Sequence, residues 1–152
     1  MARFQLDRVQ TIARPRAEVF QFFSQASNLE KLTPAFLKFR ILTPEPIEMK
    51  EGTLIDYRLK LYGWPVHWRT RIERFEPEDC FVDMQLRGPY RYWEHLHEFR
   101  DVPGGTQMRD HVQYELPLGV LGDVARGLFV RRSLERIFDF RIRAVEEVFG
   151  AA

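Results

Sequence analysis

The stretch Gly88–Gly119, GPYRYWEHLHEFRDVPGGTQMRDHVQYELPLG, decides how this chain folds. On both sides of a Pro103–Gly105 turn, apolar side chains recur at every second position, which predicts two antiparallel strands in a hairpin. Three ionisable side chains share the buried face, and burying them unpaired is costly. This face therefore indicates a cavity wall better than a solid core. Its positions are Trp93, His95, His97 and Phe99, then Met108, Asp110, Val112, Tyr114 and Leu116.

The register of this hairpin determines which polar side chains meet. A shift by two residues would bring Arg100 against Arg109 and Glu94 against Glu115, and both contacts are repulsive. We therefore expect the register that pairs Trp93 with Tyr114, His97 with Asp110, Glu98 with Arg109 and Asp101 with Thr106.

In this register His97 and Asp110 could hydrogen-bond directly. Asp110 would then fix the imidazole tautomer and raise the pKa of His97. Three interpretations remain open: a buried pair that only satisfies itself, an anchor for a ligand, or a general base. In the catalytic interpretation Asp110 orients His97, and Tyr114 donates a proton.

The His95-x-His97 spacing also suggests a metal, because alternate strand residues lie about 6.5 Å apart at Cα on one face. Zinc needs further ligands, and Asp110 is the only obvious one. The lone Cys80 excludes a multi-cysteine cluster. We expect neither a metal nor a cofactor. His67 and His111 fall on the opposite parity, so we expect them at the surface.

The remaining chain predicts a regular order of elements. A strand over Phe4–Ala13 ends at a proline and leads into a helix of about three turns, with Val19, Phe22 and Phe23 on one face. A second short helix is expected over Asn28–Leu32, and a long helix runs from Gly122 to Phe149. Between them we expect the hairpin and four further strands, at Leu37–Leu42, Thr53–Leu61, Trp64–Phe75 and Cys80–Arg87.

This β-α-α-β6-α order is that of an α+β helix-grip fold, in which a curved antiparallel sheet wraps around the long C-terminal helix. We expect one domain over residues 1–152, with a cavity between sheet and helix. The aromatic residues could equally be ordinary core. The residues that we expect at the cavity are Tyr57, Trp68, Trp93, His95, His97, Tyr114, Phe138 and Ile142.

The last helix also carries many arginines. Acidic residues are mixed among them, which is typical of a solvated helix face rather than an anion-binding surface. We therefore expect solvent exposure for Arg126, Arg131, Arg132, Arg136, Arg141 and Arg143.

The element order and several short motifs resemble the START-like superfamily, also called SRPBCC. This superfamily includes lipid-transfer domains, birch-pollen-type proteins, polyketide cyclases and coenzyme-Q-binding proteins, and the chain is most similar to a bacterial group of single-domain ligand-binding members. The motifs are Gly52-Thr53, Gly63-x-Pro65, Trp68-x-Thr70-x-Ile72, Gly88-Pro89, Trp93-x-His95-x-His97-x-Phe99, Gly105-Thr106 and Asp110-x-Val112-x-Tyr114-x-x-Pro117.

The strand Cys80–Arg87 leaves one ambiguity. Its hydrophobic alternation places Val82, Met84 and Leu86 inside, whereas the resemblance implies an Asp83-x-Gln85 pattern suited to a polar end of the pocket. A β-bulge would exchange the two faces, so both orientations stay open.

Composition limits the classes of partner. The formal net charge is +1 with 30% charged residues, which gives no bias toward nucleic acid. No apolar run is long enough to span a membrane, and no signal peptide is recognisable. We therefore expect a cytoplasmic location, with the oligomeric state undetermined.

The resemblance implies three functions. The first is binding of a small hydrophobic or aromatic molecule, such as a lipid, quinone or polyketide-like compound, in the cavity. The second is an enzyme of the polyketide cyclase or dehydratase type that uses His97 and Asp110. The third is a non-catalytic interaction protein with a filled cavity. We expect a binding protein rather than an enzyme.

Overall fold

The computed structural model describes residues 3–116 and 124–150 and confirms the helix-grip architecture. Two short 3₁₀ helices, η1 and η2, follow the first α-helix, and most of the strands come after them. In chain order the elements are β1 (Phe4–Ile12), α1 (Arg16–Phe23), η1 (Ala26–Glu30), η2 (Ala35–Leu37), β2 (Arg40–Ile41), β3 (Leu54–Leu61), β4 (Trp64–Glu76), β5 (Cys80–Arg87), β6 (Tyr92–Val102), β7 (Gly105–Glu115) and α2 (Val124–Phe149).

The strands form one antiparallel sheet in the order β1-β7-β6-β5-β4-β3-β2. β6 and β7 pair in the predicted register, with His97 opposite Asp110 and Trp93 opposite Tyr114. On the outer face Arg109 Nη1 lies 3.8 Å from Glu98 Oε1, as the charge argument required. The hairpin therefore presents His95, His97 and Asp110 to the concave side of the sheet.

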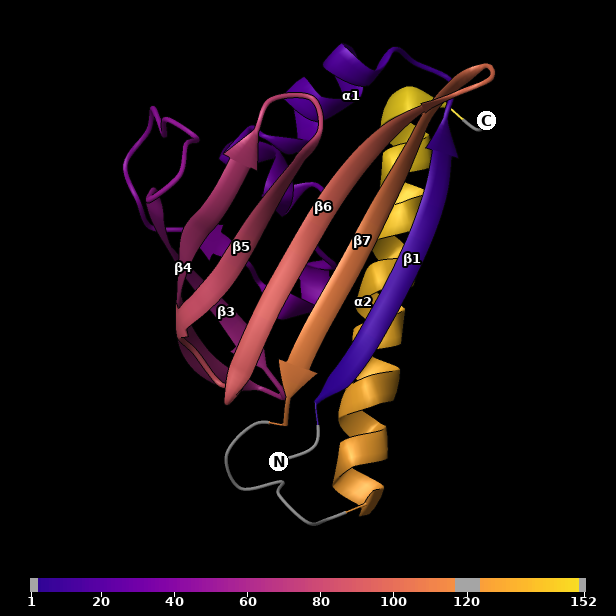
Figure 1. Ribbon diagram of the computed structural model, residues 1–152. Helices are drawn as coiled ribbons and strands as arrows, with labels where there is room; N and C mark the ends of the chain where they lie inside the picture. The colour runs from indigo at the N-terminus through magenta and orange to yellow at the C-terminus, as the bar shows by residue number, and fades with distance from the viewer. Residues whose placement is uncertain (1–2, 117–123, 151–152) are drawn as a thin grey trace.

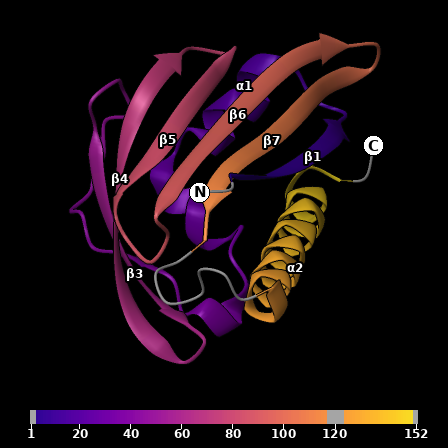
Figure 2. The ribbon, with the colours of Figure 1, turned by 60° about the horizontal axis from the view of Figure 1, so that its bottom comes forward.

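The sheet is strongly curved, and α2 lies against its concave side (Figures 1 and 2). Two register shifts between β4 and β5, at Arg69/Thr70 and Ile72/Arg74, contribute to the bend because a β-bulge increases the local twist. α2 runs beside β1. The segment around α1, η1 and η2 covers the part of the concave face formed by β3 to β6.

Buried apolar side chains fill the two ends of the concave face. At one end α1 contributes Val19, Phe20 and Phe23, and Phe20 lies edge-on to Phe99 of β6 with the ring centroids 5.2 Å apart. At the other end Trp93 and Tyr114 pack with Phe138 of α2 and other buried residues. The space between these two clusters is where the site lies.

Three local expectations were wrong. α1 has eight residues and is shorter than three turns, and the second helix is the 3₁₀ turn η1 rather than a helix over Asn28–Leu32. The strand expected over Leu37–Leu42 is reduced to Arg40–Ile41, because η2 occupies Ala35–Leu37 and Lys38 adopts a left-handed conformation. The expected start of the last helix at Gly122 lies outside the described residues.

None of the described helices is both long and apolar enough to cross a lipid bilayer.

The turn between β6 and β7 generates a stability prediction. A Cβ at Gly105 would lie 2.1 Å from the backbone oxygen of Ile12, so Gly105→Ala must push β7 away from β1. We expect a loss of more than about 2 kcal/mol in the free energy of unfolding, measured by urea denaturation.

Gly127→Ala in α2 is the matched control. Its new Cβ would meet only the Leu116 side chain at 3.5 Å, an ordinary contact, and alanine favours the helix by about 0.5–1 kcal/mol. A Gly105→Ala variant as stable as the native chain would contradict the close approach of β1 and β7.

Candidate functional site

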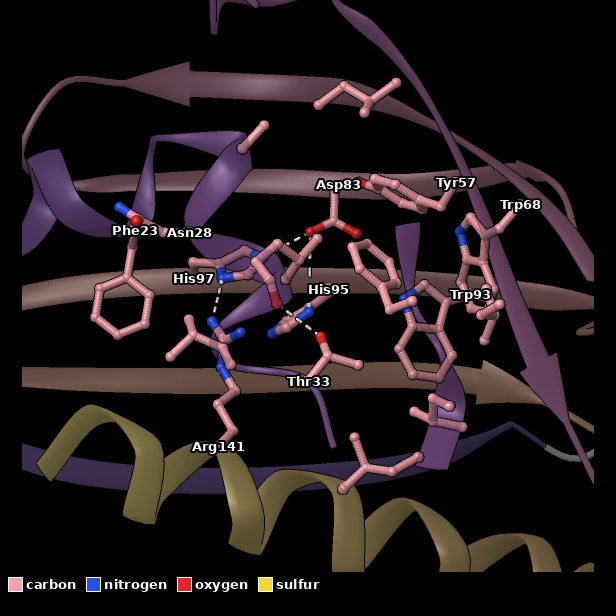
Figure 3. A pocket seen from close by; sticks show the side chains of 18 of the residues that line it. Phe23, Asn28, Thr33, Tyr57, Trp68, Asp83, Trp93, His95, His97 and Arg141 are labelled. Atoms are coloured by element: carbon pink, nitrogen blue, oxygen red, sulfur yellow. Dashed lines mark hydrogen bonds and ion pairs between the residues drawn. The ribbon is translucent and has the colours of Figure 1, made fainter. Parts of the chain in front are cut away.

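A cavity of about 180 Å³ lies between the sheet, α2 and the segment that follows α1. Its walls are mainly apolar side chains from β3, β4, η1, η2 and α2. Polar side chains reach it from Asp83, His95, His97 and Arg141, which together form one end of the cavity. Figure 3 shows these four side chains directed toward one another, while Tyr57, Trp68 and Trp93 lie farther along the wall.

Six of the eight residues expected at the cavity line it: Tyr57, Trp68, Trp93, His95, His97 and Phe138. The other two do not. Tyr114 is 2% exposed and stacks on Phe4 instead, with the ring centroids 5.6 Å apart. Ile142 is half-buried on α2 and is not among the residues that line the cavity; its backbone carbonyl accepts a hydrogen bond from Gln10 Nε2. Contact of any of these residues with a ligand stays a prediction.

The polar end is built by two stacked histidines and their carboxylate partners. The rings of His95 and His97, two residues apart on β6, stack with centroids 3.7 Å apart. His95 Nε2 lies 2.7 Å from Asp110 Oδ1, and His97 Nε2 lies 2.6 Å from Asp83 Oδ2. With Arg141 these four residues form what we call the buried polar cluster.

The predicted hydrogen bond between His97 and Asp110 is not formed, because each of these residues bonds a different partner. These residues are opposite in register, yet His97 Nδ1 is 3.6 Å from Asp110 Oδ1, too far for a hydrogen bond. The short contacts run diagonally, from His95 to Asp110 and from His97 to Asp83. Diagonal neighbours in a sheet are within reach of long side chains, so each histidine takes a carboxylate from a different neighbouring strand.

Arg141 was wrongly assigned to the solvated face of the last helix. It is 6% exposed, and its Nε donates to Asp110 Oδ2 at 3.1 Å while its Nη2 donates to His97 Nδ1 at 3.3 Å. The spacing from Phe138 to Arg141 to Val145 follows the i, i+3, i+7 rule of a buried helix face. That spacing was the available signal for its burial.

Asp83 resolves the ambiguity of β5. Phe81 and Asp83 face the cavity, and Phe81 stacks on His97 with ring centroids 4.1 Å apart. The hydrophobic alternation of this strand pointed to the wrong face, since Leu86 is 44% exposed. Gln85 instead holds the next turn, where its side chain bonds the backbone N–H and carbonyl of Tyr90.

The hydrogen bonds assign the tautomer of His97. Its Nδ1 accepts from Arg141, so the ring proton sits on Nε2 and is donated to Asp83. Burial, together with the neighbouring His95 and Arg141, lowers the pKa of His97 to about 4 despite the favourable contact with Asp83. The expected rise in its pKa was therefore wrong, and the ring is neutral at pH 7.

Both carboxylates of the cluster are ionised. Burial alone would raise the pKa of Asp110, but the charge of Arg141 and the hydrogen bond from His95 hold it well below its usual value. Burial likewise acts to raise the pKa of Asp83, but the hydrogen bond from His97 and the charge interactions with His95, His97 and Arg141 together outweigh it, so that this pKa is also lowered. Two negative charges thus face one guanidinium.

Asp83, His95 and His97 could offer three ligand atoms to a metal, because these atoms lie within 4.8 Å of one another. Asp83 takes the place that was expected for Asp110. Metal binding at His97 Nε2 would force the ring proton to Nδ1, which already accepts from Arg141 Nη2. The guanidinium therefore opposes a metal at this position.

Arg141 provides the first prediction for the site. Arg141→Met leaves Asp110 as a buried carboxylate without its cation, and removing one partner of a buried pair costs about 3–5 kcal/mol. We expect urea denaturation to show this loss, and we expect a second change, Asp110→Asn, to recover at least half of it.

Arg143→Met, at an exposed position of the same helix, is the control and should change stability by less than about 0.5 kcal/mol. A cost below about 1 kcal/mol for Arg141→Met, or no recovery in the double variant, would show that the buried pair does not hold α2 to the sheet.

The low pKa of His97 predicts a pH dependence. The unfolded chain protonates this histidine below pH 6.5, whereas the folded chain does so only near pH 4, so acid favours unfolding. Between pH 7 and pH 4.5, the titration of His97 should lower the free energy of unfolding by about 2–3 kcal/mol.

His97→Gln keeps a donor for Asp83 and removes the titration, so its stability should fall less steeply over the same range. The measurement is chemical denaturation at several pH values. An equal slope in both proteins would rule out His97 as the residue that is buried neutral.

Comparisons with known proteins agree with the geometry. ZhuI aromatase/cyclase from Streptomyces sp. R1128 has a similar structure, with a TM-score of 0.74 and 16% identity over 95% of this chain and 92% of that one. Ginseng major latex-like protein 151 from Panax ginseng gives a TM-score of 0.69 at 14% identity, over 98% and 99% of the two chains. Ara h 8.0201 gives a TM-score of 0.65 at 11% identity, over 96% of this chain and 99% of that one.

A sequence search of curated proteins finds no match. The family model described as polyketide cyclase / dehydrase and lipid transport matches residues 12–141, which are most of the chain. Together with the helix-grip fold and the motifs of the β6–β7 hairpin, this match shows that the chain belongs to the polyketide cyclase/dehydrase and lipid transport family of the START-like (SRPBCC) superfamily.

Proposed function

We propose that the protein binds a small, mostly apolar aromatic molecule in the cavity between the sheet and α2. The observation that supports this most is the composition of the cavity wall: aromatic and aliphatic side chains surround the space, and the carboxylate, imidazole and guanidinium groups lie together at one end. Ligand sites are typically apolar concavities with a few polar groups that set orientation. The buried polar cluster would supply the orientation.

The size of the cavity supports a small ligand. Apolar cavities of about 150 Å³ accept benzene, and this one measures about 180 Å³. A molecule of one or two rings fits that space better than a long acyl chain or a polycyclic polyketide does. The same volume weighs against an interaction protein whose cavity is filled by its own side chains.

The buried polar cluster is better suited to anchoring than to acid–base catalysis. A general base works best with a pKa near the operating pH, whereas His97, Asp83 and Asp110 all have pKa values displaced below that range. Both ring nitrogens of His97 also have partners, and Tyr114, the expected proton donor, does not line the cavity. A cyclase-like reaction through these residues is therefore the second candidate.

Naphthalene serves as the test probe, followed by NMR of the three tryptophan indole N–H groups. Trp68 and Trp93 line the cavity, while Trp64 is 75% exposed at the start of β4. We expect saturable shifts of the Trp68 and Trp93 signals because the probe stacks beside them, and no shift of the Trp64 signal.

Two matched variants locate the binding. Ile137 lines the cavity and Ile142 does not, although both are half-buried on α2. Ile137→Trp should fill the space and weaken naphthalene at least ten-fold, whereas Ile142→Trp should leave its affinity unchanged. Equal shifts at all three tryptophans, or equal effects of the two variants, would contradict binding in this cavity.

A further inference from the structure

We propose that Asp83 selects ligands that carry a hydrogen-bond-donating hydroxyl group on the aromatic ring and that the cavity rejects ring carboxylates. This inference rests on the proposed function and specifies its ligand class.

The two carboxylate oxygens of Asp83 have different surroundings. Oδ2 accepts from His97 Nε2 at 2.6 Å and lies 3.8 Å from His95 Nδ1. Oδ1 has no hydrogen-bond partner among residues 3–116 and 124–150. The side chain lines the cavity and keeps 18% of its surface accessible, against 6% for Asp110. Asp83 therefore presents an unused acceptor to the cavity.

Most of the neighbouring polar atoms already have partners. His97 has partners on both ring nitrogens, and His95 Nε2 is bonded to Asp110, while His95 Nδ1 lies 3.8 Å from Asp83 Oδ2. The polar groups of Asn28 and Thr33, which also line the cavity, donate to backbone carbonyls of Phe22 and Leu29. Hydrogen bonds to a charged acceptor are stronger than those to a neutral one, so a ligand donor at Asp83 Oδ1 would gain more than one elsewhere in the wall.

Charge decides between a neutral donor and an acid. Asp83 and Asp110 carry two negative charges, and the groups that can balance them already have partners: Arg141 donates through Nε to Asp110 and through Nη2 to His97, and His95 Nε2 is bonded to Asp110. A ligand carboxylate would bring a third negative charge into this end and would also lose its own hydration. A hydroxyl group adds no charge and offers the donor that Asp83 lacks.

Tyr57 would complete the contact. Its hydroxyl group lies on the Asp83 side of the cavity in Figure 3, and burial together with the charge of Asp83 holds its pKa well above the usual value. It therefore stays protonated and can donate. A ligand hydroxyl that donates to Asp83 can accept from Tyr57 at the same time, which a plain hydrocarbon cannot do.

The test compares 2-naphthol, 2-naphthoate and naphthalene at pH 7.5, where 2-naphthol is neutral and 2-naphthoate is ionised. Dissociation constants come from the tryptophan indole shifts. We expect 2-naphthol to bind at least about ten-fold more tightly than either of the others, as a hydrogen bond to a charged acceptor implies. This comparison uses the native chain and does not depend on the folding of a variant.

Asp83→Asn removes the charge and should abolish the preference for 2-naphthol over naphthalene. Asp56→Asn is the matched control: Asp56 also bonds a histidine, His67 at 2.8 Å, and an arginine, Arg69 at 2.9 Å, but it does not line the cavity. The control should keep the preference unchanged.

The outcomes separate the two proposals. If naphthalene binds in the cavity and 2-naphthol gains nothing over it, or if 2-naphthoate binds as well as 2-naphthol, selection by Asp83 is wrong and the proposed function stands. Retention of the preference in Asp83→Asn would overturn the role of Asp83 in the same way. If none of the three probes binds, the proposed function itself fails, and the ligand class fails with it.

Discussion

The contact between Asp110 on β7 and Arg141 on α2 is the interaction around which the concave side of this protein is organised. It joins the sheet to the long helix across a gap that apolar side chains fill on both sides. A buried guanidinium and carboxylate cost desolvation energy that their attraction repays only with good geometry and further hydrogen bonds. Here His95 and His97 supply those bonds.

This arrangement has consequences for the space beside it. The ion pair ties α2 to β7 at the polar end of the cavity, and elsewhere on the helix Ile137 packs against the cluster that contains Leu59 and Leu61 of β3. Residues from both regions line the cavity. The two carboxylates of the buried polar cluster also differ in how many of their oxygens are hydrogen-bonded. Asp110 is bonded on both oxygens, whereas Asp83, two strands away on β5, is bonded on one. Asp110, with both oxygens bonded, connects the sheet to α2, and Asp83, with one oxygen bonded, faces the cavity.

Much of the fold could be predicted from the sequence because strand alternation and turn residues are local signals. The β6–β7 register followed from the charges of Glu98, Arg109 and their neighbours, and it is confirmed. β2 could not be predicted, because a two-residue strand carries no period. The hydrogen-bond partners within the cluster could not be predicted either, since a register fixes Cα positions and leaves diagonal contacts open.

Two residues of the site show where sequence patterns fail. Arg141 was grouped with the exposed arginines because charged residues on a helix usually face solvent, although its spacing from Phe138 and Val145 matches a buried helix face. Two inward-facing aspartates also require a cation nearby. Asp83 was hidden by the apolar residues that flank it in β5, and only the family resemblance pointed inward. In both cases a polar residue occupies a buried position for the sake of a partner that is distant in sequence.

The most direct test of the account is a crystal structure of the protein soaked with 2-naphthol. We predict that the rings lie between α2 and the pair Trp68 and Trp93, with the naphthol oxygen about 2.7 Å from Asp83 Oδ1. A ligand bound in the cavity with its oxygen on Arg141, or one found only outside the cavity, would contradict it.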